Sequence, residues 1–63
     1  MLYDIRVSVQ TPSVFEEFGP SIHPETIRVE ALSSSQAKAL AYNQVTTRPG
    51  VIGAEVMSAS EVK

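Results

Sequence analysis

The chain of 63 residues contains no cysteine, no tryptophan and only three glycines. Without cysteine, no disulfide can stabilise the fold and no thiolate can bind zinc. No apolar run approaches the roughly 20 residues that a membrane-spanning helix needs, so we expect no membrane partner. The chain starts with a strand-like segment rather than a basic start and an apolar run. We therefore expect no signal peptide and a cytoplasmic location.

Charge of either sign is sparse, with five basic and seven acidic residues and a net charge of -2. The basic residues are scattered and form no stripe: Arg6, Arg28, Lys38, Arg48 and Lys63. A phosphate backbone would find no concentrated positive surface, so we expect no nucleic-acid partner. On the polar face of the sheet, we expect ion pairs between neighbouring strands. The residues concerned are Asp4, Arg6, Arg28, Glu30 and Glu55.

The short length predicts one domain, residues 1–63, of marginal stability. A chain of about 60 residues buries only about 60% of the surface that its unfolded form exposes. Small domains without disulfides or metals often gain stability by association. We therefore expect a homo-oligomer, most simply a dimer.

The clearest pattern is a double switch of hydrophobic period between residues 26 and 59. Residues 26–32 alternate in polarity, residues 33–47 have helical spacing, and residues 51–58 are again typical of a strand. This order predicts a strand–helix–strand unit, preceded by another strand at residues 2–10. The apolar face of that first strand is formed by Tyr3, Ile5, Val7 and Val9.

These segments predict an α+β fold, a small single-layer three-stranded sheet with one helix packed on one face (β-β-α-β). We expect the first strand to lie between the other two, antiparallel to both, as a split β-α-β unit. The alternative places the first strand at an edge. In the third strand, Ile52, Ala54 and Val56 are expected to face the core, and residues 60–63 are expected to fray.

The helix has clear signals at both ends. Ser33 is the predicted N-cap, and Gln36 completes a capping box with it. The buried stripe is predicted from the helical spacing of Ala37, Leu40, Ala41 and Val45. The helix is expected to end near Arg48, because Pro49 disfavours helical geometry before it and Gly50 favours a turn.

The connection between the first two strands, residues 11–25, is unusually long for so small a domain. Ser13 and Glu16 have the spacing of a capping box, which predicts a short helical turn over residues 14–18. Gly19 occupies the position where a helix end favours positive φ. Long connections in compact domains are usually functional, so this loop is a candidate binding element.

Residues that could suggest catalysis or metal binding have simpler structural explanations. His23 lies near Glu16, Glu17 and Glu25, but a zinc site needs several histidine or cysteine ligands at defined spacing. The serine run at residues 33–35 has no partnered base, and capping accounts for its first member. We expect no catalytic residue, no metal and no cofactor, and therefore no enzyme.

The function that we predict is that of a small non-enzymatic protein-interaction module, an inhibitor or adaptor of the kind that bacteriophages encode. It would bind itself or a larger protein through a strand edge and the loop at residues 11–25. The predicted interface residues are Val14, Phe15, Phe18, Ile22, Val51 and Met57. The two phenylalanines could instead complete the core.

Two alternatives belong to other classes. One is a nucleic-acid-binding β-ribbon dimer in which Arg6, Arg28 and Arg48 contact phosphates. The other is a small oligomeric enzyme. Small tautomerases have a similar strand–helix–strand format, but they depend on an exposed N-terminal proline, and here Leu2 follows Met1. We therefore infer no membership of that family.

Overall fold

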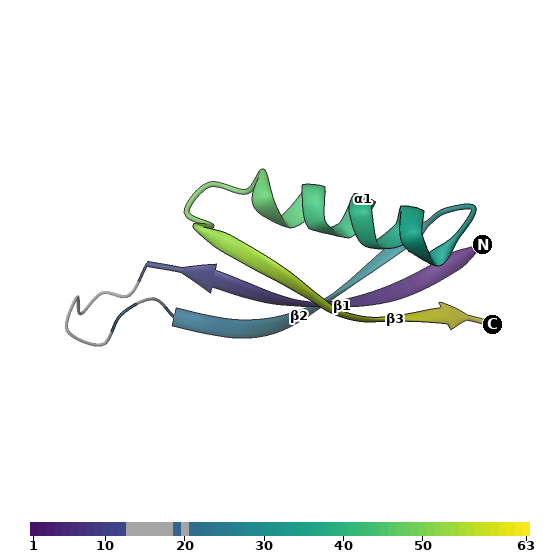
Figure 1. Ribbon diagram of the computed structural model, residues 1–63, viewed down its shortest axis with the longest axis horizontal. Helices are drawn as coiled ribbons and strands as arrows, with labels where there is room; N and C mark the ends of the chain where they lie inside the picture. The colour runs from purple at the N-terminus through teal and green to yellow at the C-terminus, as the bar shows by residue number, and fades with distance from the viewer. Residues whose placement is uncertain (13–18, 20) are drawn as a thin grey trace.

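The computed structural model describes residues 1–12, 19 and 21–63 of the chain. Three strands and one helix follow one another in the predicted β-β-α-β order (Figure 1). Their bounds are β1 (Leu2–Thr11), β2 (Ser21–Glu30), α1 (Ser34–Thr46) and β3 (Gly53–Val62). The predicted α+β class, with a single sheet and a helix on one face, is confirmed.

Strand β1 lies in the centre of the sheet, which has the order β2-β1-β3. It pairs antiparallel with both neighbours, so β2 and β3 run parallel to each other on either side of it. The predicted central position is confirmed. Its cause is the fully apolar face of β1, because a central strand is shielded from both sides. Three of its side chains are buried to 1% exposure or less: Ile5, Val7 and Val9.

The first hairpin is longer than the sequence pattern predicts. Its ladder runs from the pair Leu2 and Glu30 to the pair Thr11 and Ser21. The predicted connection at residues 11–25 is therefore wrong at both ends, since strand residues occupy positions 11 and 21–25. Residues 21–25 are polar and include a proline, which weakens a strand signal, but an edge strand tolerates both. The expected helical turn at residues 14–18 lies outside the described residues.

Strand β3 begins and ends later than predicted, at Gly53 and Val62 instead of residues 51 and 58. The chain end does not fray as expected, because its last strand residue, Val62, pairs with Leu2. Ile52, expected in the core, precedes the strand and is 60% exposed. The register shifts between Arg6 and Val7.

This shift is a β-bulge at Met57. Val7 is opposite Val56 and Arg6 is opposite Ser58, so Met57 is the extra residue on β3. On β3, every second side chain faces the core up to the bulge. After the bulge this alternation continues, shifted by one residue. For this reason, Ala59 packs against the core although simple alternation from Val56 places it on the other face.

Helix α1 starts as predicted after Ser33, whose Oγ accepts a hydrogen bond from the Gln36 amide at 3.2 Å. The Gln36 side chain accepts a second bond, from the amide of Leu32 at 2.7 Å. The buried stripe consists of Ala37, Ala41 and Val45. Leu40 was predicted in this stripe but is 39% exposed. The buried residues are spaced four apart along a narrow stripe, and Leu40 lies beside that stripe.

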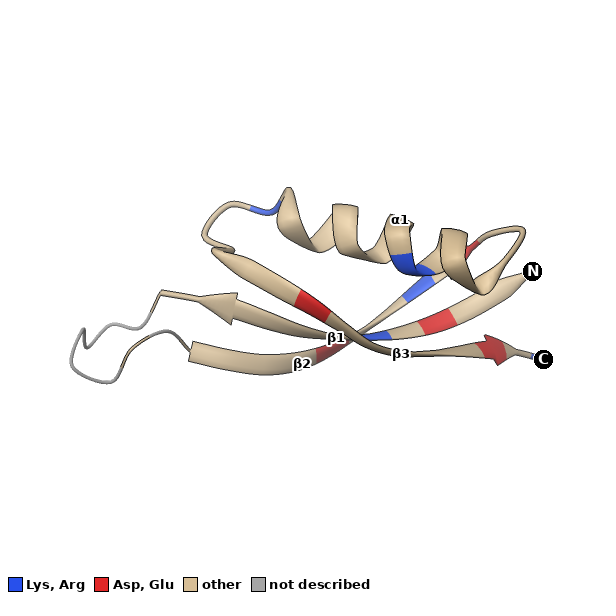
Figure 2. Cartoon of the chain, in the orientation of Figure 1, with Lys and Arg blue, Asp and Glu red and all other residues tan. Residues whose placement is uncertain are grey.

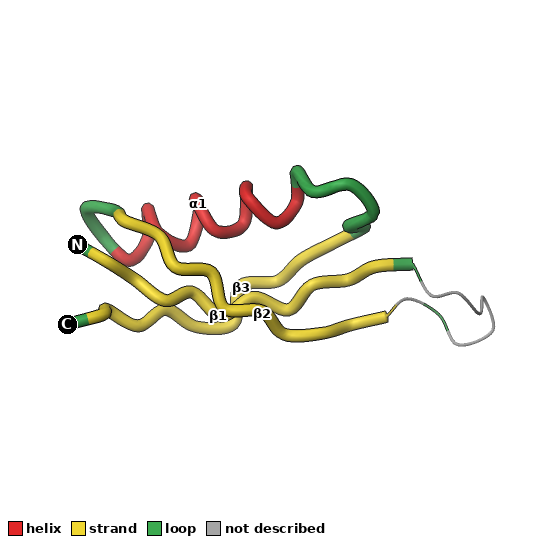
Figure 3. Tube along the Cα trace, turned by 180° about the vertical axis from the view of Figure 1, so that it is seen from behind, coloured by secondary structure: helices red, strands yellow, loops and turns green. Residues whose placement is uncertain are grey.

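The helix covers only one face of the sheet, and no other described element covers the opposite face (Figure 1). Seen from behind, the β1–β2 hairpin extends beyond the C-terminal end of the helix, and both chain termini lie at the other end (Figure 3). The buried core between helix and sheet consists of Tyr3, Ile5, Val7, Val9, Ile27, Val29, Ala31, Ala37, Ala41 and Val45. The contribution expected of Phe15 and Phe18 lies outside the described residues.

Candidate functional site

The two edges of the sheet are its most distinctive surface features. Strands β2 and β3 each have β1 as their neighbour on one side, and no other described strand pairs with them. The backbone groups on the outer sides of β2 and β3 are therefore available to another strand. Each edge strand is ten residues long, which is long for an unprotected edge.

Two hydrogen bonds establish which backbone groups point outward. The Ala31 amide donates to the Met1 carbonyl at 2.8 Å, so odd-numbered residues of β1 direct their backbone toward β2. The Ile52 amide donates to the Gln10 carbonyl at 2.9 Å, so even-numbered residues direct theirs toward β3. Because antiparallel ladders alternate bonded and non-bonded pairs, the outward groups of both edges follow from the register.

On β3, five residues lie opposite even-numbered β1 residues and direct their backbone groups toward β1: Gly53, Glu55, Ser58, Ser60 and Val62. The outward groups therefore belong to Ala54, Val56, Ala59 and Glu61. Three of these residues, the two alanines and the valine, are only partly buried and pack against the core. An added strand would cover these apolar side chains as well as pairing the free backbone.

The edge of β2 has a different character. Its outward groups belong to Ile22, Pro24, Thr26, Arg28 and Glu30, which are opposite even-numbered β1 residues. Proline has no amide hydrogen, so the donor row of this edge is interrupted at Pro24. The uninterrupted part comprises residues 26–30.

One ion pair joins β1 and β2 on the uncovered face. Arg28 donates to both carboxylate oxygens of Asp4, at 2.8 Å from Nε and 3.1 Å from Nη2. The hydrogen bonds from Arg28 lower the pKa of Asp4, against a smaller opposing effect of desolvation. The same contact raises the pKa of Arg28. The expected network is confirmed at this pair alone, since no described ion pair includes Arg6, Glu30 or Glu55.

Charges of both signs are distributed over the whole described chain (Figure 2). Blue and red segments both occur on β1 and β2, whereas β3 carries red segments alone. A surface of this kind gives little long-range attraction for a polyanion.

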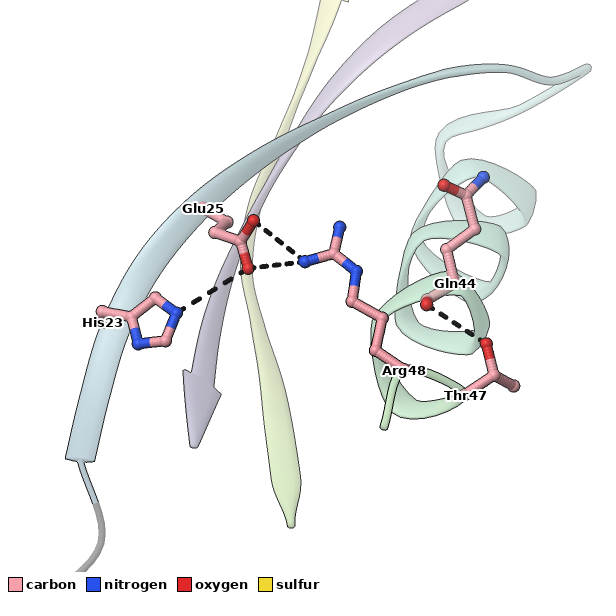
Figure 4. Close-up of polar contacts among 5 residues, drawn as sticks. All are labelled: His23, Glu25, Gln44, Thr47 and Arg48. Carbon is pink, nitrogen blue, oxygen red and sulfur yellow. Dashed lines mark hydrogen bonds and ion pairs between the residues drawn. The ribbon is translucent and has the colours of Figure 1, made fainter. Parts of the chain in front are cut away.

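A second cluster joins the end of α1 to the hairpin (Figure 4). The Nη1 atom of Arg48 lies 3.0 and 2.8 Å from the two carboxylate oxygens of Glu25. His23 Nε2 lies 3.8 Å from Glu25 Oε2. Thr47 donates to the carbonyl oxygens of Asn43 and Gln44, which closes the last turn of the helix. This cluster explains Arg48 and Glu25 as structural contacts between helix end and strand.

The described members of the predicted interface do not come together in one patch. Ile22 is 61% exposed at the β2 edge, whereas Met57 is 61% exposed on the β3 bulge, at the opposite edge of the sheet. Val51 is partly buried against the core and so presents little side chain to a partner. The other three predicted residues, Val14, Phe15 and Phe18, lie outside the described residues.

The sequence pattern missed the second half of the β3 edge. Ala59 lay beyond the predicted strand and Glu61 was assigned to a fraying end, yet the backbone groups of both residues face outward from a paired strand. The available signal was the spacing of Val56 and Ala59, which share a face of a strand only if one extra residue lies between them. No rule in a single sequence fixes the position of such a bulge.

Within the described part of the chain, no pocket is present and no group of three or more metal-binding side chains occurs. No helix in that part has the length and apolar character needed to cross a membrane. No known protein family, curated protein or solved structure matches this chain.

Proposed function

We propose that this protein is a non-enzymatic interaction module whose β3 edge pairs with an extended segment of a partner protein. The supporting observation is the row of outward backbone groups at Ala54, Val56, Ala59 and Glu61, beside apolar side chains that are only partly buried. In this mode of recognition, main-chain hydrogen bonds supply affinity and alternate side chains supply specificity.

The composition of β3 supports this edge over β2. Natural edge strands are usually protected by proline, lysine, an inward-pointing charge or a β-bulge. β3 has the sequence GAEVMSASEV, which contains neither proline nor a basic residue. Its only irregularity is the bulge at Met57, whereas β2 carries Pro24 among its outward residues.

The charge of β3 indicates the kind of segment that it would accept. Glu55 and Glu61 are its only charged residues, and no described ion pair includes either. An antiparallel pair of two β3 strands centred on Glu55 would place the two copies of that residue opposite each other, which is unfavourable. We therefore propose a foreign segment that places a lysine or arginine opposite Glu55.

Proline scanning tests this proposal without requiring a known partner. Peptides of about ten residues, displayed as a random library, are selected on the immobilised chain. The selected peptides are then titrated against Ala59→Pro. The Ala59 amide points away from β1, so the proline removes an outward donor and leaves the internal ladder intact.

We expect peptides that contain a lysine or arginine, bind the wild-type chain and lose at least tenfold in affinity for Ala59→Pro. The matched control is Thr26→Pro, which removes an outward donor from the other edge and should retain binding. Circular dichroism spectra of both variants confirm that the fold is retained. Peptides that bind Ala59→Pro as well as wild type, or a selection that yields no binder, would contradict the proposal.

The part of the prediction that concerns the loop at residues 11–25 stays a prediction. Among its described residues, the exposed large hydrophobic side chain is that of Ile22, at the far end of the hairpin from the chain termini.

A further inference from the structure

The β2 edge carries a pattern of charge that the proposed function does not use. In its uninterrupted part, the outward residues are Thr26, Arg28 and Glu30. Arg28 and Glu30 have opposite charges and are two positions apart on the same face. When two copies of a strand pair antiparallel about a two-fold axis, residues equally far before and after the axis in the two copies lie opposite each other. The register therefore decides which charges meet.

Only one register within residues 26–30 makes these charges complementary. A two-fold axis at Arg28 would place the two copies of Arg28 opposite each other, and an axis at Glu30 would do the same with Glu30. An axis at Ile27 would place Arg28 opposite Thr26. An axis at Val29 places each Arg28 opposite Glu30 of the second copy, and symmetry makes this pair occur twice.

We propose that the β2 edge pairs antiparallel with the β2 edge of a second copy of this chain, about a two-fold axis at Val29. The backbone groups of Arg28 and Glu30 point outward in this stretch, so they can form the new ladder. Side chains that are directly opposite in such a ladder lie within reach of an ion pair.

The existing contact of Arg28 prepares it for this role. Its Nε and Nη2 atoms donate to Asp4, which fixes the guanidinium on the uncovered face. A guanidinium has five N–H donors, so Nη1 and the second hydrogen of Nη2 can still reach another carboxylate. Glu30 is exposed and belongs to no described ion pair, so its carboxylate is available.

The product is one continuous sheet of six strands, three from each copy, with both helices on the same face. Its outer edges are the two β3 strands, so the dimer would present the proposed binding edge twice. The dimer does not depend on that binding. Linking two such edges raises the apparent affinity for a partner with two segments.

A charge exchange between two variants tests the register directly. Glu30→Arg leaves arginine at both positions 28 and 30, and two such chains repel each other. The variant Asp4→Arg/Arg28→Glu leaves glutamate at both positions and keeps the intrachain pair in reversed form. Each variant alone should be monomeric, whereas an equimolar mixture should form a heterodimer in which all charges are complementary.

Sedimentation equilibrium over a range of concentrations gives the dissociation constants. We expect the dimer dissociation constant of Glu30→Arg to rise by about tenfold or more relative to wild type, because two attractive ion pairs become repulsive. We also expect the wild-type dimer to weaken as salt is raised, since the pairs are exposed. Circular dichroism spectra establish that both variants are folded before they are mixed.

Three results would overturn the proposal. The first is a wild-type chain that is monomeric throughout. The second is a Glu30→Arg dimer as tight as wild type, and the third is a mixture of folded variants that does not associate. Ala59→Pro is the control, because it alters only the β3 edge and should dimerise as wild type does. Peptide binding that survives in a monomeric chain would separate failure of the dimer from failure of the proposed function.

Discussion

Asp4 and Arg28 are directly opposite each other in the β1–β2 ladder, and their side chains form a two-point hydrogen-bonded ion pair on the uncovered face. The pair fixes a long basic side chain at a sheet edge, where it would otherwise be free to move. The hydrogen bonds from Arg28 are the main cause of the lowered pKa of Asp4.

This pKa shift predicts a specific pH dependence of stability. A carboxyl group with a lower pKa in the folded chain stabilises the fold wherever the unfolded group is ionised, above about pH 4. That contribution is lost as the pH falls through the folded pKa of Asp4. The difference in unfolding midpoint between wild type and Asp4→Asn should therefore vanish in acid, and urea titrations from pH 2 to 7 measure it.

Arg28→Gln isolates the cause of the shift. Removing the guanidinium should raise the pKa of Asp4 toward the ordinary value of about 3.9, which carbon-detected NMR titration follows directly. Arg6→Gln is the matched control, since Arg6 lies on the same face and belongs to no described ion pair. An Asp4 pKa that responds equally to both substitutions would contradict the assignment.

The N-cap of α1 gives a prediction about stability. Ser33 Oγ accepts a bond from the Gln36 amide, one of the donors that a helix start leaves without a partner. Ser33→Ala should lower the free energy of unfolding by about 1 kcal/mol. Ser35→Ala, at an exposed position inside the helix, should leave it unchanged or raise it slightly, because alanine is the better helix former. Equal effects in thermal unfolding would disprove the capping role.

Local signals predicted most of the fold correctly. The alternation of β1 and the capping pattern at Ser33 depend on neighbouring residues, and both elements begin where the sequence indicated. The central place of β1 also followed from sequence, because a strand with an unbroken apolar face needs shielding on both sides. These features need no knowledge of distant contacts.

The errors have a common physical cause. Residues 21–25 and 59–62 have weak strand propensity, and they are extended because β1 supplies a pairing partner along its whole length. Tertiary contacts of this kind outweigh the intrinsic strand propensity of the residues. The bulge at Met57 then changes the face of every later residue on β3, which alternation alone cannot reveal.

The candidate site was predicted only in part. A free strand edge follows from a three-stranded sheet, and Val51 and Met57, in or next to β3, were predicted interface residues. Which of its amides point outward depends on the register with β1 and on the bulge, so Ala59 and Glu61 became evident only from the paired structure. The charge pairing at the β2 edge likewise required the register.

Packing between helix and sheet gives a fourth prediction. Ala37 and Ala41 are completely buried and allow α1 to approach the sheet closely. Ala41→Leu adds three carbon atoms to this contact and should cost about 1–3 kcal/mol of stability through overpacking. Ala39→Leu makes the same change at an exposed helical position and should alter stability by about 0.5 kcal/mol or less. Urea unfolding of both variants measures the difference, and equal values would show that the contact is loosely packed.

The turn between α1 and β3 gives the last prediction. Gly50 has φ of +84°, in the left-handed region that side chains disfavour, although a Cβ there would meet nothing within 4 Å. Gly50→Ala should therefore destabilise the fold by backbone strain alone, by about 1–2 kcal/mol.

Gly53→Ala is the matched control: its φ is ordinary, and the added Cβ would lie 3.2 Å from Gln10 Oε1, the far end of a flexible side chain. That side chain can move aside, so Gly53→Ala should be close to neutral. Thermal unfolding of the two variants distinguishes strain from crowding, and a larger loss at Gly53 would show that crowding dominates this turn.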